Sequence, residues 1–153
     1  MVGPKPIETI YHGYRFRSRL EARWAVLFDA LGIKYEYEKE GFDLGKLGYY
    51  LPDFYLPATG WFVEVKGDPS DINGIAKARE LDACPPKYAM GCIIVSTPEY
   101  ARYWHEKNGP PNWNDAFITF QLVTSDTGHI NMAAYNRAVT KARMARFERG
   151  GGM

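Results

Sequence analysis

The sequence predicts a single α/β domain in which helices flank a mixed central β-sheet. The chain of 153 residues suits one domain that buries about two-thirds of its unfolded surface. Its hydrophobic content of 46% and charged content of 24% are ordinary for a soluble globular protein. Segments with helical periodicity alternate with β-rich runs along the chain, and this order indicates a sheet covered by helices.

Composition argues against several other classes of protein. No apolar run approaches the roughly 18 residues needed to cross a bilayer, so no membrane partner is expected. The segment MVGPKPIETI lacks the apolar core of a secretion signal. Cys84 and Cys92 fit reduced thiols, and the three histidines match no zinc spacing. We therefore expect a cytoplasmic protein, and the absence of a P-loop motif predicts no nucleotide cofactor.

The first predicted helix begins at Ser18, because SRLE forms a capping box with Glu21 three residues after the cap. Gly32 is expected to end this helix. Its apolar side chains share one face. They are Leu20, Trp24, Leu27, Phe28 and Leu31.

Three β-rich runs follow this helix. IKYEYE, residues 33–38, alternates in polarity and predicts a half-exposed strand. YYLPDFYL and WFVEVKG predict two further strands, and the connecting PATG is typical of a tight hairpin.

The second half of the chain predicts helices and strands in alternation. Residues 71–83 have a helical pattern, although Gly74 disfavours it. GCIIVS is an apolar run that suits a buried strand. The remaining predicted elements are a helix over residues 98–107, a proline-rich loop over 108–115, a strand over 116–123 and a closing helix over about 131–147.

Charged residues interrupt the most strand-like part of the chain. Side chains in a strand alternate between faces, so Phe62, Glu64 and Lys66 share one face. Val63 and Val65 share the other face and are expected to enter the core. Glu64 and Lys66 should therefore lie side by side above the sheet.

Asp53 is the second acidic residue in this region. Pro52 precedes it and implies a bulge or an edge position, and hairpin pairing would let Asp53 approach Glu64. Converging carboxylates repel each other and raise one another's pKa, a conflict that a divalent cation removes. Oxygen ligands suit Mg²⁺ or Mn²⁺. Lys66 beside such an ion could orient or help deprotonate a water and balance phosphate charge, which predicts metal-assisted phosphodiester hydrolysis.

The residues LPDF and EVK, with ten residues between Asp53 and Glu64, resemble the signature of the PD-(D/E)XK nuclease superfamily. This resemblance implies a restriction-endonuclease-like core over residues 10–96. It implies that Asp53, Glu64 and the backbone carbonyl of Val65 bind Mg²⁺, for which Mn²⁺ can substitute. The signature's lysine matches Lys66.

Many members of the superfamily carry an upstream helical glutamate, and FRSRLEARWA supplies Glu21 in such a setting. The resemblance implies that Glu21 acts on the metal directly or through water. Each acid also has a simpler interpretation. Glu21 could only cap its helix, Asp53 could be a turn residue beside Pro52, and Glu64 with Lys66 could form a surface ion pair.

The net charge of +1 conceals two basic flanks around an acidic middle, an arrangement that suits a bound polyanion. Arginines at the start of the Glu21 helix could hold a phosphate near the metal. They are Arg15, Arg17 and Arg19. The basic C-terminal helix, taken as residues 131–149, could project along DNA as a phosphate-binding arm, or could be a frayed terminus. Its arginines are Arg143, Arg146 and Arg149.

Together these features predict a single nuclease domain over residues 1–153 that acts as a Mg²⁺-dependent endonuclease on DNA. The short chain favours a structure-directed enzyme, such as a homodimer that cuts branched DNA in the manner of Holliday junction resolvases in recombination and repair. The alternatives are a restriction or nicking endonuclease that reads a short sequence or a mismatch, and a catalytically silent nucleic-acid-binding module. The compact format fits a phage or mobile-element origin.

Overall fold

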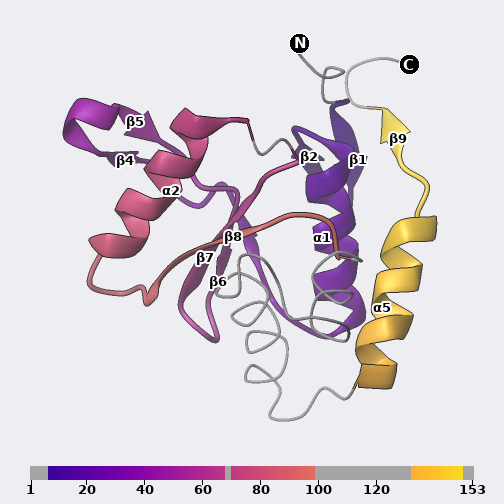
Figure 1. The fold of residues 1–153 in the computed structure, drawn as a ribbon. Helices are drawn as coiled ribbons and strands as arrows, with labels where there is room; N and C mark the ends of the chain where they lie inside the picture. The colour runs from indigo at the N-terminus through magenta and orange to yellow at the C-terminus, as the bar shows by residue number, and fades with distance from the viewer. Residues whose placement is uncertain (1–6, 68–69, 99–131, 150–153) are drawn as a thin grey trace.

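A computed structural model describes residues 7–67, 70–98 and 132–149 and has an α/β fold. The predicted class is confirmed, because a mixed sheet carries helices on both faces (Figure 1). The predicted helix over 98–107, the loop over 108–115 and the strand over 116–123 fall almost entirely outside the described residues.

The central sheet has the strand order β3-β6-β7-β8. Its strands are β3 (Glu36–Tyr37), β6 (Phe54–Leu56), β7 (Trp61–Val65) and β8 (Gly91–Val95). The β3–β6 and β6–β7 pairs are antiparallel, whereas β7 and β8 are parallel. The parallel pair requires a crossover connection, which helix α2 (Ile72–Ala83) supplies.

Side-chain alternation along β7 divides the interior into two layers, as predicted. Val63 and Val65 belong to a core shared with α1 (Arg19–Ala30) and α5 (Met132–Met144). Phe62 faces the other way and packs in a smaller core with residues of α2. Within the described ranges, every helix is too short or too polar to span a bilayer.

Helix α1 begins and ends where the sequence predicts. Ser18 is its N-cap in extended conformation, and the Ser18 hydroxyl accepts a hydrogen bond of 3.1 Å from the amide of Glu21. Gly32 follows the C-cap with a φ of 73°, in the left-handed region that glycine favours. Its apolar face is buried at Trp24 and Leu27, and the Trp24 indole donates to the carbonyl of Ser96 beyond β8 at 2.5 Å.

Two small hairpins were not predicted. Strands β1 (Thr9–Tyr11) and β2 (Tyr14–Phe16) join through His12 and Gly13, which have φ angles of 48° and 81°. Two consecutive positive φ angles match the tight turn whose twist suits paired strands. The second hairpin pairs β4 (Phe42–Asp43) with β5 (Tyr49–Tyr50) around a 3-10 turn, η1 (Gly45–Leu47), and lies beside α2 in Figure 1.

The run YYLPDFYL is two strands in the structure and not one. Tyr49 and Tyr50 pair with β4, while Phe54–Leu56 form β6 in the central sheet. Pro52 lies between them, where a residue without an amide hydrogen cannot complete a ladder, so the predicted interruption is confirmed. The run IKYEYE is likewise shorter than predicted, with only Glu36–Tyr37 in a strand.

The C-terminal helix ends earlier than predicted, and the projecting basic arm over residues 131–149 is a wrong prediction for this segment. Helix α5 stops at Met144, and β9 (Glu148–Arg149) returns to pair antiparallel with β1 (Figure 1). Phe147 accounts for the change of direction, because its half-buried ring packs edge-on against the ring of Tyr11. The centroids of the two rings are 5.9 Å apart. The apolar stripe of α5 is confirmed, since Tyr135, Val139 and Ala142 are buried.

Candidate active site

The fold brings the predicted acids together at one end of β7. Glu21 lies in the first turn of α1, and Asp53 lies in the bend before β6. The hairpin pairs Phe54 with Val63, so the same register extended by one residue sets Asp53 opposite Glu64. All three acidic residues are buried, with exposed fractions of 8% for Glu21, 8% for Asp53 and 5% for Glu64. The interpretation of Glu64 as a surface residue is therefore wrong.

Asp53 is bound to the strand opposite it. Its Oδ2 accepts a hydrogen bond of 2.8 Å from the amide of Val65, and its backbone carbonyl accepts one of 2.8 Å from the amide of Glu38. Asp53 does occupy a bend after Pro52, as the turn interpretation expects. Its buried carboxylate shows that the bend also directs this side chain to the acidic cluster, which we define as Glu21, Asp53 and Glu64.

Each carboxylate oxygen of Glu64 has a donor. Oε1 accepts a hydrogen bond of 2.6 Å from the hydroxyl of Tyr50, and Oε2 lies 3.0 Å from Nζ of Lys66. Lys66 follows β7 directly, and its amide donates to the carbonyl of Val95 at 2.8 Å. Its ammonium also donates to Oδ2 of Asp71 at 2.7 Å. Glu64 and Lys66 are thus held by partners from two other segments.

Glu21 combines capping with a place in the cluster. Its amide donates to the Ser18 hydroxyl, which is one half of a capping box. Its carboxylate does not bond to the Ser18 amide; Oε2 instead accepts from the Ser18 hydroxyl at 2.9 Å and Oε1 from the Tyr37 hydroxyl at 2.5 Å. The two interpretations of Glu21 are therefore compatible.

Burial and the repulsion of neighbouring carboxylates shift Asp53 and Glu21 toward their protonated forms. Burial raises the pKa of Asp53 well above its ordinary value, and the charges of Glu64 and Glu21 raise it further, against the Val65 amide and Lys66. Burial also raises the pKa of Glu21, although the Tyr37 and Ser18 hydroxyls act in the opposite direction.

Lys66 is stabilised in its charged form. Burial lowers the pKa of the Lys66 ammonium, but hydrogen bonding to Asp71 and the charge and hydrogen bond of Glu64 outweigh this effect and raise it above its ordinary value. The same ion pair lowers the pKa of Asp71. One ammonium is thus set against a cluster of three buried carboxylates.

A bound cation would relieve the repulsion among these buried carboxylates. In the part of the chain that the structure describes, no group of three or more His, Cys, Asp or Glu side chains could hold a metal ion by itself. Mg²⁺ does not require such a group, because it binds through one or two carboxylates and keeps several waters. Asp53 and Glu64 supply carboxylate oxygens of the kind that Mg²⁺ prefers.

Three residues that hold the predicted acids and the lysine were not predicted from the sequence: Tyr37, Tyr50 and Asp71. Tyr37 and Tyr50 each donate to one buried acid, and Asp71 is the N-cap of α2. An N-cap at Asp71 could have been inferred from its place before a helical pattern. The tyrosine partners had no local signal, because they depend on how separate strands pair.

The predicted phosphate-binding arginines are distributed over two regions. Arg15 pairs with Glu8 at 2.8 Å, and Arg17 pairs with Glu38 at 2.5 Å. Arg17 lies near the acidic cluster, because its amide donates to the same Tyr37 hydroxyl that contacts Glu21. Arg19 is exposed in the first turn of α1.

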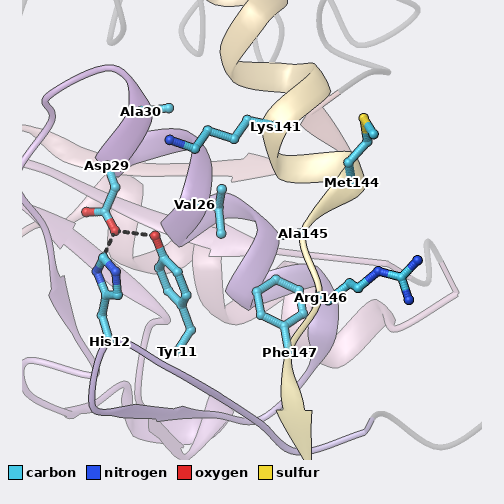
Figure 2. Close-up of a pocket in the computed structure, with 10 residues that line it drawn as sticks. All are labelled: Tyr11, His12, Val26, Asp29, Ala30, Lys141, Met144, Ala145, Arg146 and Phe147. Atoms are coloured by element: carbon cyan, nitrogen blue, oxygen red, sulfur yellow. Dashed lines mark hydrogen bonds and ion pairs between the residues drawn. The ribbon is translucent and has the colours of Figure 1, made fainter.

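The C-terminal arginines lie elsewhere, at the end of α5. Arg143 and Arg146 are exposed, and the backbone of Arg149 belongs to β9. Arg146 lines a hollow of about 600 Å³ between α1, α5 and β1 (Figure 2). At its edge the Tyr11 hydroxyl donates to Asp29 at 2.7 Å, and His12 lies 3.1 Å from the same oxygen. None of the residues of the acidic cluster lines this hollow.

A comparison of the chain with protein-family models, with curated proteins and with solved structures finds no match. The chemistry of its own residues is therefore the basis for a functional assignment. Buried acids with shifted pKa values beside a lysine are typical of catalytic sites, and the hollow has no comparable group of buried charges.

Replacing Tyr50 with phenylalanine tests the support of Glu64. If Glu64 binds Mg²⁺, the variant, which removes the donor to Oε1, should lower the affinity for Mg²⁺ about 10-fold to 100-fold. Isothermal titration calorimetry with Mg²⁺ measures this loss. Tyr49→Phe is the matched control, because the neighbouring Tyr49 side chain is 65% exposed. Equal Mg²⁺ affinity in the two variants would show that Tyr50 does not support a metal ligand.

Proposed function

We propose that this protein is a Mg²⁺-dependent endonuclease of the PD-(D/E)XK superfamily that hydrolyses phosphodiester bonds in DNA. The observation that supports the proposal most strongly is the convergence of three buried carboxylates with one lysine at the end of β7. Isolated buried charge destabilises a fold, and groups of buried acids with raised pKa values are characteristic of functional sites.

Asp53 and Glu64, with the backbone carbonyl of Val65, are the proposed ligands of the metal. When bound, Mg²⁺ would polarise the phosphoryl group and lower the pKa of an attacking water. The raised pKa of Asp53 supports this assignment, because a cation would relieve the repulsion that contributes to the shift. Glu21 would act on the metal directly or through a water.

The proposed role of Lys66 is to orient and to balance charge. Its ammonium contacts Glu64 and Asp71, and these carboxylates stabilise the protonated form. A protonated lysine cannot accept a proton from water, whereas it can donate to a phosphate oxygen and offset developing negative charge. Of the two roles that the sequence allowed, this contact pattern favours orientation and charge balance over deprotonation.

Helix N-termini add to the proposed phosphate site. The first turn of α1 carries Glu21, and the N-cap of α2 contacts Lys66. The segment that follows β7 approaches the first turn of α1, since a Cβ added at Gly67 would lie 3.3 Å from Leu20. Backbone amides at helix N-termini bear partial positive charge and favour anions such as phosphate.

The proposed substrate is branched DNA, cut by a homodimer in an intracellular setting. A twofold dimer would present two related active sites, which would suit a symmetric junction. Cys84 and Cys92 are both free, which suits a reducing compartment.

Matched linear, nicked, flap and four-way-junction DNAs test the proposed substrate. With equal concentrations of each and Mg²⁺ present, we expect the junction to be cut fastest and all cutting to cease in EDTA. Cutting of linear duplex at defined sequences without preference for the junction would instead indicate a restriction or nicking enzyme. Binding of every DNA without cutting would indicate a silent nucleic-acid-binding module.

A further inference from the structure

The N-terminus of α2 makes two contacts through one side chain. Oδ1 of Asp71 accepts a hydrogen bond of 3.1 Å from the amide of Gly74 and so caps the helix. Oδ2 accepts a hydrogen bond of 2.7 Å from Nζ of Lys66. The two oxygens of Asp71 therefore link the start of α2 to the lysine beside the acidic cluster.

Gly74 leaves the space in which this contact forms. A Cβ at Gly74 would lie 2.5 Å from Nζ of Lys66, 2.9 Å from Cε of Lys66 and closer still to Oδ2 of Asp71. Gly74 has an ordinary helical backbone, so its conformational freedom does not explain its presence. Alanine is more favourable in a helix than glycine. The chain thus carries a weaker helix former where the lysine and its partner need room.

The two carboxylates occupy two of the three donors of the ammonium. One N–H of Lys66 serves Glu64 at 3.0 Å and another serves Asp71 at 2.7 Å. The side chain of Lys66 is 17% exposed, so the ammonium stands at the border of the buried cluster and solvent. Fixing two donors restricts where the third can point.

We propose that Asp71 is a positioning residue that holds the Lys66 ammonium toward the reacting phosphate, and that Gly74 is required because it admits this contact. The inference rests on the proposed function, since a phosphate is the group that the third donor would meet. In this proposed role Asp71 acts through Lys66 and touches neither the substrate nor the metal.

The variant Asp71→Asn separates positioning from capping. Asparagine caps helices about as effectively as aspartate, and its side-chain oxygen can still accept the hydrogen bond from the Gly74 amide. It lacks the negative charge that holds Lys66. We expect kcat to fall about 10-fold to 100-fold, because a small displacement of a catalytic group has an effect of this size. KM and the thermal midpoint should stay near those of the native protein. A merely structural role would lower the midpoint and leave kcat unchanged.

The variant Gly74→Ala tests the same contact from the opposite side. It should lower kcat by displacing the end of Lys66 and Oδ2 of Asp71, whereas the thermal midpoint should change little, since the preference of alanine for the helix offsets the disturbed cap. The matched control is Asn73→Ala, at the exposed neighbouring position of α2. Native kcat in Gly74→Ala would overturn the role given to Gly74.

Acylation of lysines, followed by mass spectrometry, tests the contact without any nuclease activity. The rate at Lys66 should rise several-fold in Asp71→Asn, while the exposed Lys87, which lies outside this contact, reacts as in the native protein. An unchanged rate at Lys66, or an unchanged kcat, would overturn the inference. Faster acylation in a protein whose native form cuts no DNA would keep the Asp71 contact and overturn the nuclease assignment, so the two failures are distinguishable.

Discussion

Replacement of Glu64 by glutamine is expected to lower Mg²⁺-dependent cleavage at least about 100-fold while the fold is retained. Glutamine has the same length, and its amide can exchange hydrogen bonds with the Tyr50 hydroxyl that now donates to Oε1. What it lacks is the negative charge that would bind Mg²⁺ and pair with Lys66. Initial cleavage rates at saturating Mg²⁺, together with urea unfolding, separate lost chemistry from lost structure.

The control for this substitution is Glu80→Gln, which makes the same change at an exposed position of α2. Glu80→Gln should cleave at the native rate. If Glu64→Gln also cleaves at the native rate, Glu64 takes no part in the reaction, and the proposed metal site is wrong.

Replacement of Asp53 by asparagine is expected to abolish cleavage and yet to stabilise the metal-free protein. Burial and the charges of Glu64 and Glu21 make the ionised form of Asp53 unfavourable in the folded state. Asparagine removes that charge and keeps an acceptor for the Val65 amide. At pH 7 the free energy of unfolding should rise by about 1–3 kcal/mol, measured by urea denaturation in EDTA.

The pH dependence of this gain has a definite sign. The folded-state pKa of Asp53 lies above its ordinary value of 3.8, so between those two values the folded protein binds more protons than the unfolded chain. The native protein therefore loses stability as the pH rises through this window, and Asp53→Asn should lose less. Well below pH 3.8 Asp53 is protonated in both states, so the difference in stability between the two proteins should no longer change with pH.

Mg²⁺ should make the native protein more stable than Asp53→Asn, which is the reverse of the order expected without metal. A ligand that binds only the folded state raises its stability, so added Mg²⁺ should raise the thermal midpoint of the native protein and leave that of Asp53→Asn unchanged. Equal responses of both proteins to Mg²⁺ would contradict a metal site at Asp53. If metal-free Asp53→Asn is less stable than the native protein at pH 7, the ionised carboxylate of Asp53 does not destabilise the fold.

Local patterns were sufficient to predict the parts of the fold that have local causes. The cap at Ser18 and the glycine at position 32 bound α1 because both act within one helical turn. The valines of β7 enter the core because alternation follows from strand geometry. Pairings between distant segments could not be predicted in this way, and β9, which joins residues 148–149 to β1, depends on one such contact.

The same distinction between local patterns and long-range pairing applies to the residues of the candidate site. Asp53, Glu64 and Lys66 could be predicted because two neighbouring strands and a short turn bring them together. The donors that support Glu64 and Glu21 depend on longer-range pairing. Tyr50 reaches Glu64 from the β4–β5 hairpin, and Tyr37 reaches Glu21 from the edge strand β3. Polarity patterns in the sequence do not predict which tyrosine hydroxyl will donate a hydrogen bond to which acid.

The most direct test of the proposed nuclease activity is the cleavage of end-labelled four-way-junction DNA by the native protein and by Lys66→Ala, each in Mg²⁺ and in EDTA. The proposal predicts discrete products from the native protein in Mg²⁺, none in EDTA, and a loss of at least about 100-fold in Lys66→Ala. Cleavage by Lys66→Ala at the native rate, or cleavage that persists in EDTA, would contradict it.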